Sequence, residues 1–312
     1  MGPAPLRYTQ YHNQPASSPL HRWLTEMWAA VSAETGGRFE VETCAQNNGI
    51  PGGDPAALQL LLGGEIHFFT LMGGLIGAVV PVAEMQGLPF AFRSHAHVFA
   101  VMDGEFGDYL RQEMAARGLY PLPRATFENG FRQISTRTRP IRDADDLVGL
   151  TIRTPAGKLF TDFFESLGAK PKAINLNQLY AALEAGVVEA QENPLVVTEF
   201  NRLWEVQQYV SVTNHMWSGF NLLANLAAWK AMPEDVRAVI ERTAGQYAIG
   251  QRRDTDALNA ALAERLAGRG MVFNQADAAS FRRRLGPFYA RWKTIFGARA
   301  WSLLEAHAGP LG

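Results

Sequence analysis

Two arginines in the middle of the sequence have the chemistry needed to hold a small organic anion. Arg132 lies in FENGFRQIST, between aromatic residues and a β-branched run, and Arg153 closes the apolar run LVGLTIR directly before Thr-Pro. Most arginines are solvated surface residues, but a planar guanidinium can hold a carboxylate through two parallel hydrogen bonds. Open α/β sheets bind ligands at the carboxyl ends of their strands. We therefore interpret Arg132 and Arg153 as candidate carboxylate-binding residues.

Other kinds of site lack the residues that they need. The segment MGGLIG carries Met72 where a dinucleotide-binding fingerprint has its first glycine, and the sequence contains no GxxxxGK[ST] phosphate loop and no GxSxG nucleophile elbow. His95 and His97 have no further metal ligands beside them, and we expect them to face solvent on a strand or loop. The single cysteine, Cys44, excludes an intrachain disulfide. These patterns predict no cofactor, no metal and no catalytic group.

The elements that must position the arginines follow an alternating helix and strand pattern. Apolar residues recur with helical spacing from Leu20 to Val31, and Asp54 with Pro55 is typical of a helix start, with Asp54 as N-cap. LVGLTIR has the pattern of a strand, and LYAALEAGVVEAQENP that of a helix, a glycine and a strand. Residues 233–268 are almost wholly helical in pattern, and at ~1.5 Å per residue such a helix is long enough to tie two lobes together.

Length and charge set the broad class. With 312 residues and 47% apolar residues the chain exceeds the size at which single cores usually split, so we expect two lobes. The 29 basic and 30 acidic residues nearly cancel, which favours a small ligand over a nucleic acid or an anionic membrane. No apolar run approaches the roughly 18 residues of a membrane span. We expect a soluble chain in which Met1 and Gly2 replace a removed leader.

Four segments carry a family resemblance: NGFRQIST, RPIRDADDLVGLTIRTPAGKLF, LYAALEAGVVEAQENP and VTNHMWSGF. In this order and spacing they resemble the solute-binding subunits of tripartite ATP-independent periplasmic (TRAP) transporters, the DctP-type family, over nearly the whole chain. The resemblance implies an α/β, two-lobed periplasmic binding protein (type II-like) with a long helix spanning both lobes. It further implies a monomer that closes around an organic acid and delivers it to TRAP membrane subunits. The expected lobes are 1–129 plus about 216–258, and 130–215 plus about 259–312.

The resemblance also implies roles for individual residues. Arg153 resembles the family's principal arginine, which pairs with the ligand carboxylate, and Arg132 resembles its second arginine. Asn193 resembles the asparagine that hydrogen-bonds the ligand. Asn13 and Asp54 fall where members that bind sugar acids place polar contacts. No bond is broken in this mechanism.

Two positions depart from the sugar-acid pattern. Met72 falls where sialic-acid-binding members carry a ligand-binding glutamate, and Leu176 falls where they often carry an aromatic wall. Since a site for hydroxyl groups needs buried polar partners, Met72 argues against a polyhydroxylated ligand. Trp217 and Phe220 are candidates for an apolar wall, although most aromatic residues nearby are expected to be core. The favoured ligand is a monocarboxylate with an apolar or aromatic tail, such as a 2-oxo or 2-hydroxy acid.

Several alternatives stay open at the level of sequence. A sugar acid or a C4-dicarboxylate is the alternative ligand, and a cation could take part in binding. An enzyme acting on a carboxylic acid would use the arginines as a clamp, with His12 or His215 as base. A sensor would present the ligand to a receptor instead of a transporter.

Overall fold

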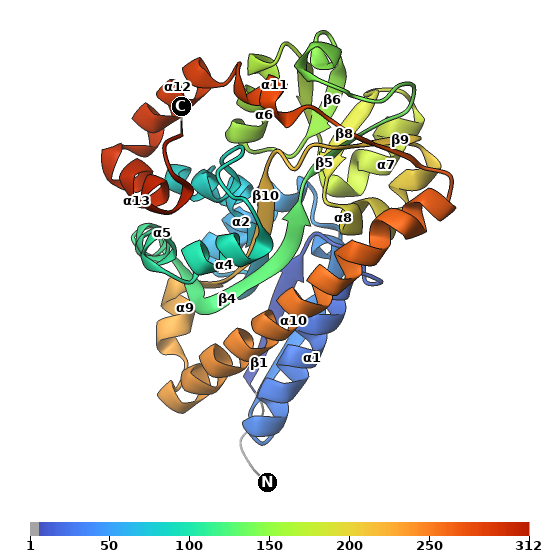
Figure 1. Ribbon diagram of the computed structural model, residues 1–312. Coiled ribbons are helices and arrows are strands. Elements are labelled where there is room, and N and C mark those ends of the chain that lie inside the picture. Colours follow the sequence, from blue (N-terminus) through green and yellow to red (C-terminus); the bar gives the residue numbers. More distant parts are fainter. Residues whose placement is uncertain (1–5, 312) are drawn as a thin grey trace. The chain divides into compact units, whose positions relative to one another are not determined.

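The structure, a computed structural model, describes residues 6–311 (Figure 1). The described residues divide into two compact units: unit 1 comprises residues 6–72, 111–128 and 219–255, and unit 2 comprises residues 73–110, 129–218 and 256–311. Each unit contains one β-sheet, so the predicted α/β class is confirmed. Met1 and Gly2, expected to replace a leader, lie outside the described residues. Among the described residues, no helix has both the length and the apolar character needed to cross a bilayer.

Unit 1 is built on a five-stranded sheet whose elements come from three stretches of chain. These elements are β1 (Leu6–His12), α1 (Pro19–Glu34), β2 (Phe39–Cys44), the 3-10 helix η1 (Ala45–Gly49), α2 (Gly53–Gly63), β3 (Phe68–Met72), β4 (Leu119–Phe131), β10 (Trp217–Asn225), α9 (Leu226–Ala231) and most of α10 (Glu234–Gly268). The strand order is β2-β1-β3-β10-β4; β1 is parallel to β2 and β3, and β10 is antiparallel to β3.

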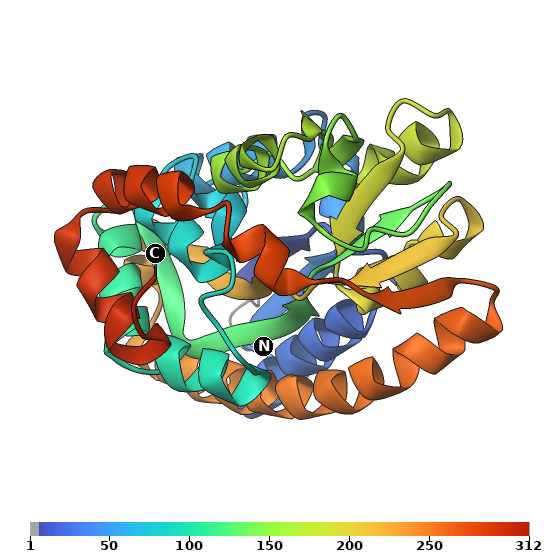
Figure 2. The ribbon, with the colours of Figure 1, turned by 45° about the horizontal axis from the view of Figure 1, so that its top comes forward.

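Helix α1 forms where the apolar spacing predicts it. Ser18 is its N-cap and accepts the backbone N–H of His21, which satisfies a donor that the first turn leaves open. The buried face of α1 covers the sheet, with the Trp28 ring 4.7 Å from that of Phe68. Along its unit 1 part, α10 lies beside α1 in both ribbon views (Figures 1 and 2), and Trp23 fills the space where a side chain at Gly250 would stand.

Unit 2 is built on a six-stranded sheet with the order β11-β9-β5-β8-β6-β7. Its strands are β5 (Gln133–Thr136), β6 (Thr151–Thr154), β7 (Lys170–Ala173), β8 (Ala190–Asn193), β9 (Tyr209–Val212) and β11 (Val272–Gln275). Its α-helices are α3 (Gly73–Ile76), α4 (His95–Met102), α5 (Glu105–Ala115), which runs on into unit 1, α6 (Lys158–Ser166), α7 (Leu176–Glu184), α8 (Leu195–Phe200), α11 (Ala278–Arg282), α12 (Gly286–Phe296) and α13 (Ala298–Ala308). Its 3-10 helices are η2 (Pro81–Gly87), η3 (Ala144–Leu147) and η4 (Leu203–Glu205).

The assignment of residues 73–110 differs from the expected lobes. These residues were expected in the first lobe, whereas their packing groups them with unit 2. A Cβ on Gly74 would come within 2.3 Å of the Phe160 ring, so α3 lies directly against α6. The backbone N–H of Leu159 donates to Glu84 on η2 at 2.6 Å. These tertiary contacts leave no trace in the local pattern of residues 73–110.

Individual elements confirm some predictions and correct others. The helix predicted for residues 233–268 is α10, which continues from unit 1 into unit 2. Asp54 is not the N-cap of α2, because Gly52 takes that position with φ 89° and Asp54 lies inside the first turn. The strand expected from LVGLTIR begins only at Thr151, since η3 and a turn at Gly149 (φ 78°) precede it. His95 and His97 lie in the first turn of α4, where Ser94 is the N-cap, and not on a strand or loop.

Candidate anion-binding site

Unit 2 brings three of the expected residues to one edge of its sheet. Strands β6 and β8 are parallel neighbours, with Arg153 opposite Gln191, so Arg153 and Asn193 both lie toward the carboxyl ends of their strands. Arg132 directly precedes β5, whose first residue pairs with Asn193 in the antiparallel direction. Register therefore places Arg132, Arg153 and Asn193 at the edge where α/β sheets bind ligands.

Arg132 is fully buried and forms an ion pair with Glu192. Its Nε donates to Glu192 Oε2, and its Nη2 donates to Glu192 Oε1 at 2.8 Å and to the Glu192 carbonyl at 2.7 Å. The ring of Phe160 lies 5.0 Å from the guanidinium carbon, which adds a cation–π contact. Burial alone would raise the pKa of Glu192, but the Arg132 guanidinium and hydrogen bonds from His215 and Arg132 hold that pKa below its usual range. The pair is therefore ionised and nearly neutral in sum.

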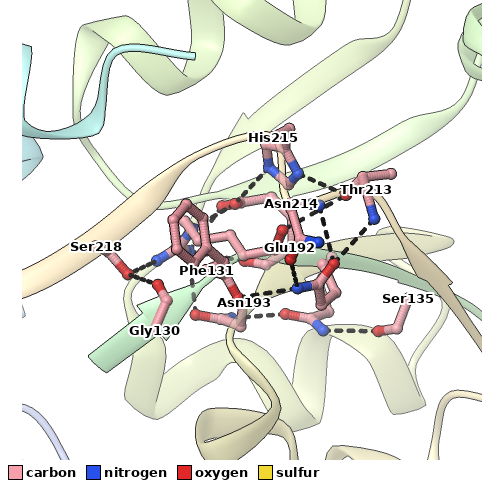
Figure 3. Close-up of polar contacts among 12 residues, drawn as sticks. Gly130, Phe131, Ser135, Glu192, Asn193, Thr213, Asn214, His215 and Ser218 are labelled. Carbon is pink, nitrogen blue, oxygen red and sulfur yellow. Dashed lines mark hydrogen bonds and ion pairs between the residues drawn. The ribbon is translucent and has the colours of Figure 1, made fainter. Parts of the chain in front are cut away.

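His215 completes this buried network (Figure 3). Its Nε2 lies 3.1 Å from Glu192 Oε2, and its Nδ1 lies 2.7 Å from the Thr213 hydroxyl. The Phe163 ring stacks on the imidazole, with centroids 5.4 Å apart and planes 2° from parallel. Burial lowers the pKa of His215 more strongly than the Glu192 carboxylate raises it. A neutral imidazole fits both contacts when Nε2–H donates to Glu192 and the Thr213 hydroxyl donates to Nδ1.

Asn193 is held from both sides by the same network. Its Oδ1 accepts from Arg132 Nη2 at 3.1 Å, and its Nδ2 donates to Gln191 Oε1 at 2.6 Å. Gln191 in turn donates to the Ser135 hydroxyl at 2.6 Å (Figure 3). The Gln-Glu-Asn cluster is thus a connected set of buried hydrogen bonds that fixes the orientation of the Asn193 amide.

Glu192 was not predicted from the sequence to take part in the site. It directly precedes the candidate Asn193, and the expected partner of Arg132 was a ligand instead of a residue of the chain. A charged residue inside a fully buried strand needs a paired cation. The buried pattern of AQEN, together with an arginine near a neighbouring strand, was the available signal.

Arg153 is 3% exposed, and a hydrogen bond to a backbone carbonyl holds its guanidinium in place. Its Nε donates to the carbonyl oxygen of Ile174 at 2.7 Å, which orients the guanidinium plane.

After β6 the chain turns into α6, and Glu84 accepts the Leu159 N–H in the first turn of that helix. Burial raises the pKa of Glu84 to about 7, against the lowering effect of the Leu159 N–H.

Unit 1 brings Asn13 and Asp54 together. Asn13 Nδ2 donates to Asp54 Oδ2 at 2.8 Å, and Asn47 Nδ2 donates to Asp54 Oδ1 at 2.7 Å. Gln14 donates to Asn13 Oδ1 at 2.8 Å. All four side chains are at least nine-tenths buried, and Asn47 was not among the residues predicted from the sequence.

The apolar residues predicted to line the site are divided between the two units. Met72 and Phe220 lie directly opposite each other on β3 and β10 in unit 1. Trp217, in unit 2, contacts the rings of Phe92 and Phe99. Leu176 packs into a core cluster with leucines of α7, which explains its apolar character without a ligand. The described residues contain no group of three potential metal ligands.

Comparisons with known proteins identify the family. A profile of the DctP family, the bacterial extracellular solute-binding proteins of family 7, matches residues 11–294. A solute-binding protein of Verminephrobacter eiseniae is 31% identical over 272 residues, which are 86% of this chain and 80% of that protein. The protein y4mM of Sinorhizobium fredii is 32% identical over 229 residues, which are 73% of this chain but only 42% of that longer protein.

Solved structures agree with this result. A TRAP periplasmic solute-binding protein from a Polaromonas species, bound to D-erythronate, is 27% identical and superimposes with a TM-score of 0.90, covering 98% of this chain and 99% of that one. The fold and the sequence therefore point to the same group of transport proteins. The chain belongs to the DctP family of bacterial extracellular solute-binding proteins and is a TRAP solute-binding protein.

Proposed function

We propose that this protein captures a small monocarboxylate with an apolar tail and delivers it to TRAP membrane subunits in the periplasmic compartment. Arg153 binds the carboxylate, and closure of the protein around the acid completes capture. Polar contacts from Asn13, Asp54 and Asn193 orient the ligand. The protein acts as a monomer and catalyses no reaction.

The observation that carries the proposal is the orientation of Arg153. Its Nε donates to the Ile174 carbonyl at 2.7 Å, which fixes the guanidinium plane at the carboxyl end of a buried strand. An oriented guanidinium at that edge matches a ligand carboxylate in charge and geometry. Arg132 then acts by holding Asn193, to which it donates at 3.1 Å, and by contributing to the field of the site.

Energetics are consistent with useful affinity. Charge-assisted hydrogen bonds contribute about 1.5–3 kcal/mol each, and apolar burial contributes ~25 cal/mol per Å². Two such bonds and a short tail are enough for a dissociation constant near 1 μM, about −8 kcal/mol. The paired Met72 and Phe220 side chains supply apolar surface in unit 1, and they support a tail that is not covered with hydroxyl groups.

The enzyme alternative needs a base that can reach a substrate. Both ring nitrogens of His215 have partners within the network, Glu192 and Thr213. His12 Nδ1 accepts the Gln14 N–H and its Nε2 contacts His21, and burial lowers the pKa of His12 to about 3. These contacts favour structural roles for both histidines. Turnover of a bound acid would overturn this conclusion.

A thermal-shift screen of ligand-stripped protein tests the proposal. At 100 times Kd a ligand stabilises the folded state by about 2.7 kcal/mol, a shift of several degrees. The screen compares apolar 2-hydroxy and 2-oxo acids with C4-dicarboxylates and sugar acids. Arg153→Ala is expected to abolish the shift, and Arg117→Ala, a surface arginine, to leave it unchanged. A shift with sugar acids or dicarboxylates alone would refute the ligand class, and an Arg153→Ala protein that still binds would refute the clamp.

A further inference from the structure

A groove in unit 1 runs between helix α1 and the strands β1 and β2. It is lined by residues 7–9 of β1, residues 40–42 of β2 and one side of α1 that carries Thr25, Ala29 and Ser32. All of these residues belong to unit 1. The volume of the groove is about 540 Å³, which lies within the range of about 300–1,000 Å³ that is usual for ligand sites.

Helix α10 covers the other side of α1. The Trp23 ring lies 5.8 Å from that of Tyr247, and Glu34 forms an ion pair with Arg242 (Figure 1). At 3.6 residues per turn, Trp23 and Glu34 point away from the side of α1 that lines the groove. The groove is therefore bounded by α1 above and by β2 beside it, and α10 does not close it.

Strand β2 lies at the edge of the five-stranded sheet and pairs with β1 in the parallel direction. The carbonyl of Arg38 accepts the Leu6 N–H at 2.9 Å, so it faces β1. Peptide groups of successive residues point to opposite sides of a strand, and those of Phe39, Val41 and Thr43 therefore face away from β1. An edge strand offers such groups to an added strand. A groove between an edge strand and a helix suits an extended peptide, because it supplies backbone partners and a recess for side chains.

The side chains around β2 define the chemistry of that peptide. Phe39 packs near Trp28 of α1, with ring centroids 6.3 Å apart, so Val41 also faces the helix side. Glu40 and Glu42 point to the opposite face and are exposed. An added strand would place alternate side chains beside Val41 and beside the two glutamates, which favours apolar residues alternating with basic ones. The β2 strand of a second copy would set carboxylates beside carboxylates, which disfavours self-association.

We propose that this groove binds an extended segment of the TRAP membrane subunits, in which apolar and basic residues alternate, as an added strand beside β2. The inference rests on the proposed function and assigns it a docking surface. Residues 7–9 lie in the amino-terminal half of β1, whereas Asn13 follows the carboxyl end of that strand. Docking therefore leaves the polar contacts of Asn13 and Asp54 undisturbed, and a loaded protein can dock.

A synthetic peptide tests strand addition in the unmodified protein. The probe is a labelled acetyl-Lys-Val-Lys-Val-Lys-Val-Lys-amide, and its control has glutamate in place of lysine. In anisotropy titrations we expect the lysine peptide to bind more tightly by about tenfold or more, because it faces Glu40 and Glu42. Equal binding of the two peptides, or binding of neither, would overturn the inference and leave the proposed function in place.

Variants assign the binding to the edge of β2. Val41→Pro removes the N–H that faces away from β1, and an edge strand tolerates proline there. We expect it to weaken the lysine peptide by about tenfold or more, whereas Val41→Ala, which keeps the N–H, should cause a smaller loss. If Val41→Pro does not fold, Glu42→Lys is the second test, with Glu65→Lys, an exposed position elsewhere in unit 1, as its control. Unchanged binding in Glu42→Lys would overturn the inference.

The membrane subunits themselves decide the partner. The TRAP membrane subunits of the source organism are embedded in nanodiscs, and binding of the wild type and of Val41→Pro is measured by surface plasmon resonance. We expect the variant to bind more weakly by about tenfold or more, with an unchanged thermal shift in the acid screen. Equal binding of both proteins, or a dimer that only Val41→Pro dissociates, would overturn the inference alone. A wild type that does not bind the subunits would overturn the delivery step of the proposed function as well.

Discussion

Unit 2 buries two carboxylates, Glu192 and Glu84, and their surroundings shift the two pKa values in opposite directions. Glu192 faces Arg132 and His215, and its pKa lies below the usual range despite complete burial. Glu84 accepts a single backbone N–H from Leu159, and burial raises its pKa to about 7. The comparison shows that a directly bonded guanidinium reverses the effect of burial, whereas one peptide N–H does not. Glu192 is therefore a permanent charge, and Glu84 gains or loses its proton near neutral pH.

The largest expected effect on stability comes from removing the Glu192 carboxylate that pairs with Arg132. In Glu192→Ala the buried Arg132 charge loses its partner, so we expect the free energy of unfolding to fall by about 3–5 kcal/mol. Glu189→Ala, an exposed glutamate three residues earlier, is the control and should change stability by less than about 0.5 kcal/mol. Urea denaturation measures both. A loss below about 1 kcal/mol would show that the ion pair is not a fixed part of the fold.

The unpaired carboxylate predicts a pH effect of intermediate size. The pKa of Glu84 is raised from 4.5 to about 7 in the folded protein, so its neutral form favours folding at low pH and this contribution is lost as pH rises from about 4.5 to 7. Each pKa unit corresponds to about 1.4 kcal/mol, which gives an effect of about 3 kcal/mol. Glu84→Gln removes the titration and keeps the shape.

The measurement is the stability difference between Glu84→Gln and wild type at several pH values. This difference should become more favourable to the variant as pH rises from 5 to 8. Taking the difference matters because His12 and His215, with lowered pKa values, make the wild type lose stability as pH falls below about 6.5. A difference that does not change with pH would contradict the raised pKa.

The comparison also separates what sequence can predict from what it cannot. The long helix α10 and the helix α1 follow from apolar spacing and capping, because those signals are local. Arg153 and Asn193 could be placed at a strand edge for the same reason. The pairing of Arg132 with Glu192 spans 60 residues of sequence and depends on the antiparallel register of β5 and β8, which no local pattern encodes.

Local signals also failed where tertiary packing decides. The apolar start of LVGLTIR predicted a strand, but Gly149 turns the chain and the strand begins two residues later. Asp54 has the residue type of an N-cap, yet its carboxylate holds two asparagine amides instead. Polar residues with long-range partners thus mislead local rules, and in this protein several of them lie in the candidate site.

The smallest expected effect comes from the uncharged part of the Glu192 network, the hydrogen bond between Thr213 and His215. Thr213→Val keeps the side-chain shape and removes the hydroxyl that faces His215 Nδ1 at 2.7 Å. Because the Arg132 and Glu192 charges stay paired, we expect a loss of only about 1–2 kcal/mol, the cost of one unmet buried acceptor. Thr138→Val, at an exposed position, is the control. Urea denaturation measures both variants. If Thr213→Val loses as much stability as Glu192→Ala, the network depends on the orientation of His215 as much as on the ion pair. The different pKa values of Glu192 and Glu84 would then have a further cause besides the Arg132 guanidinium.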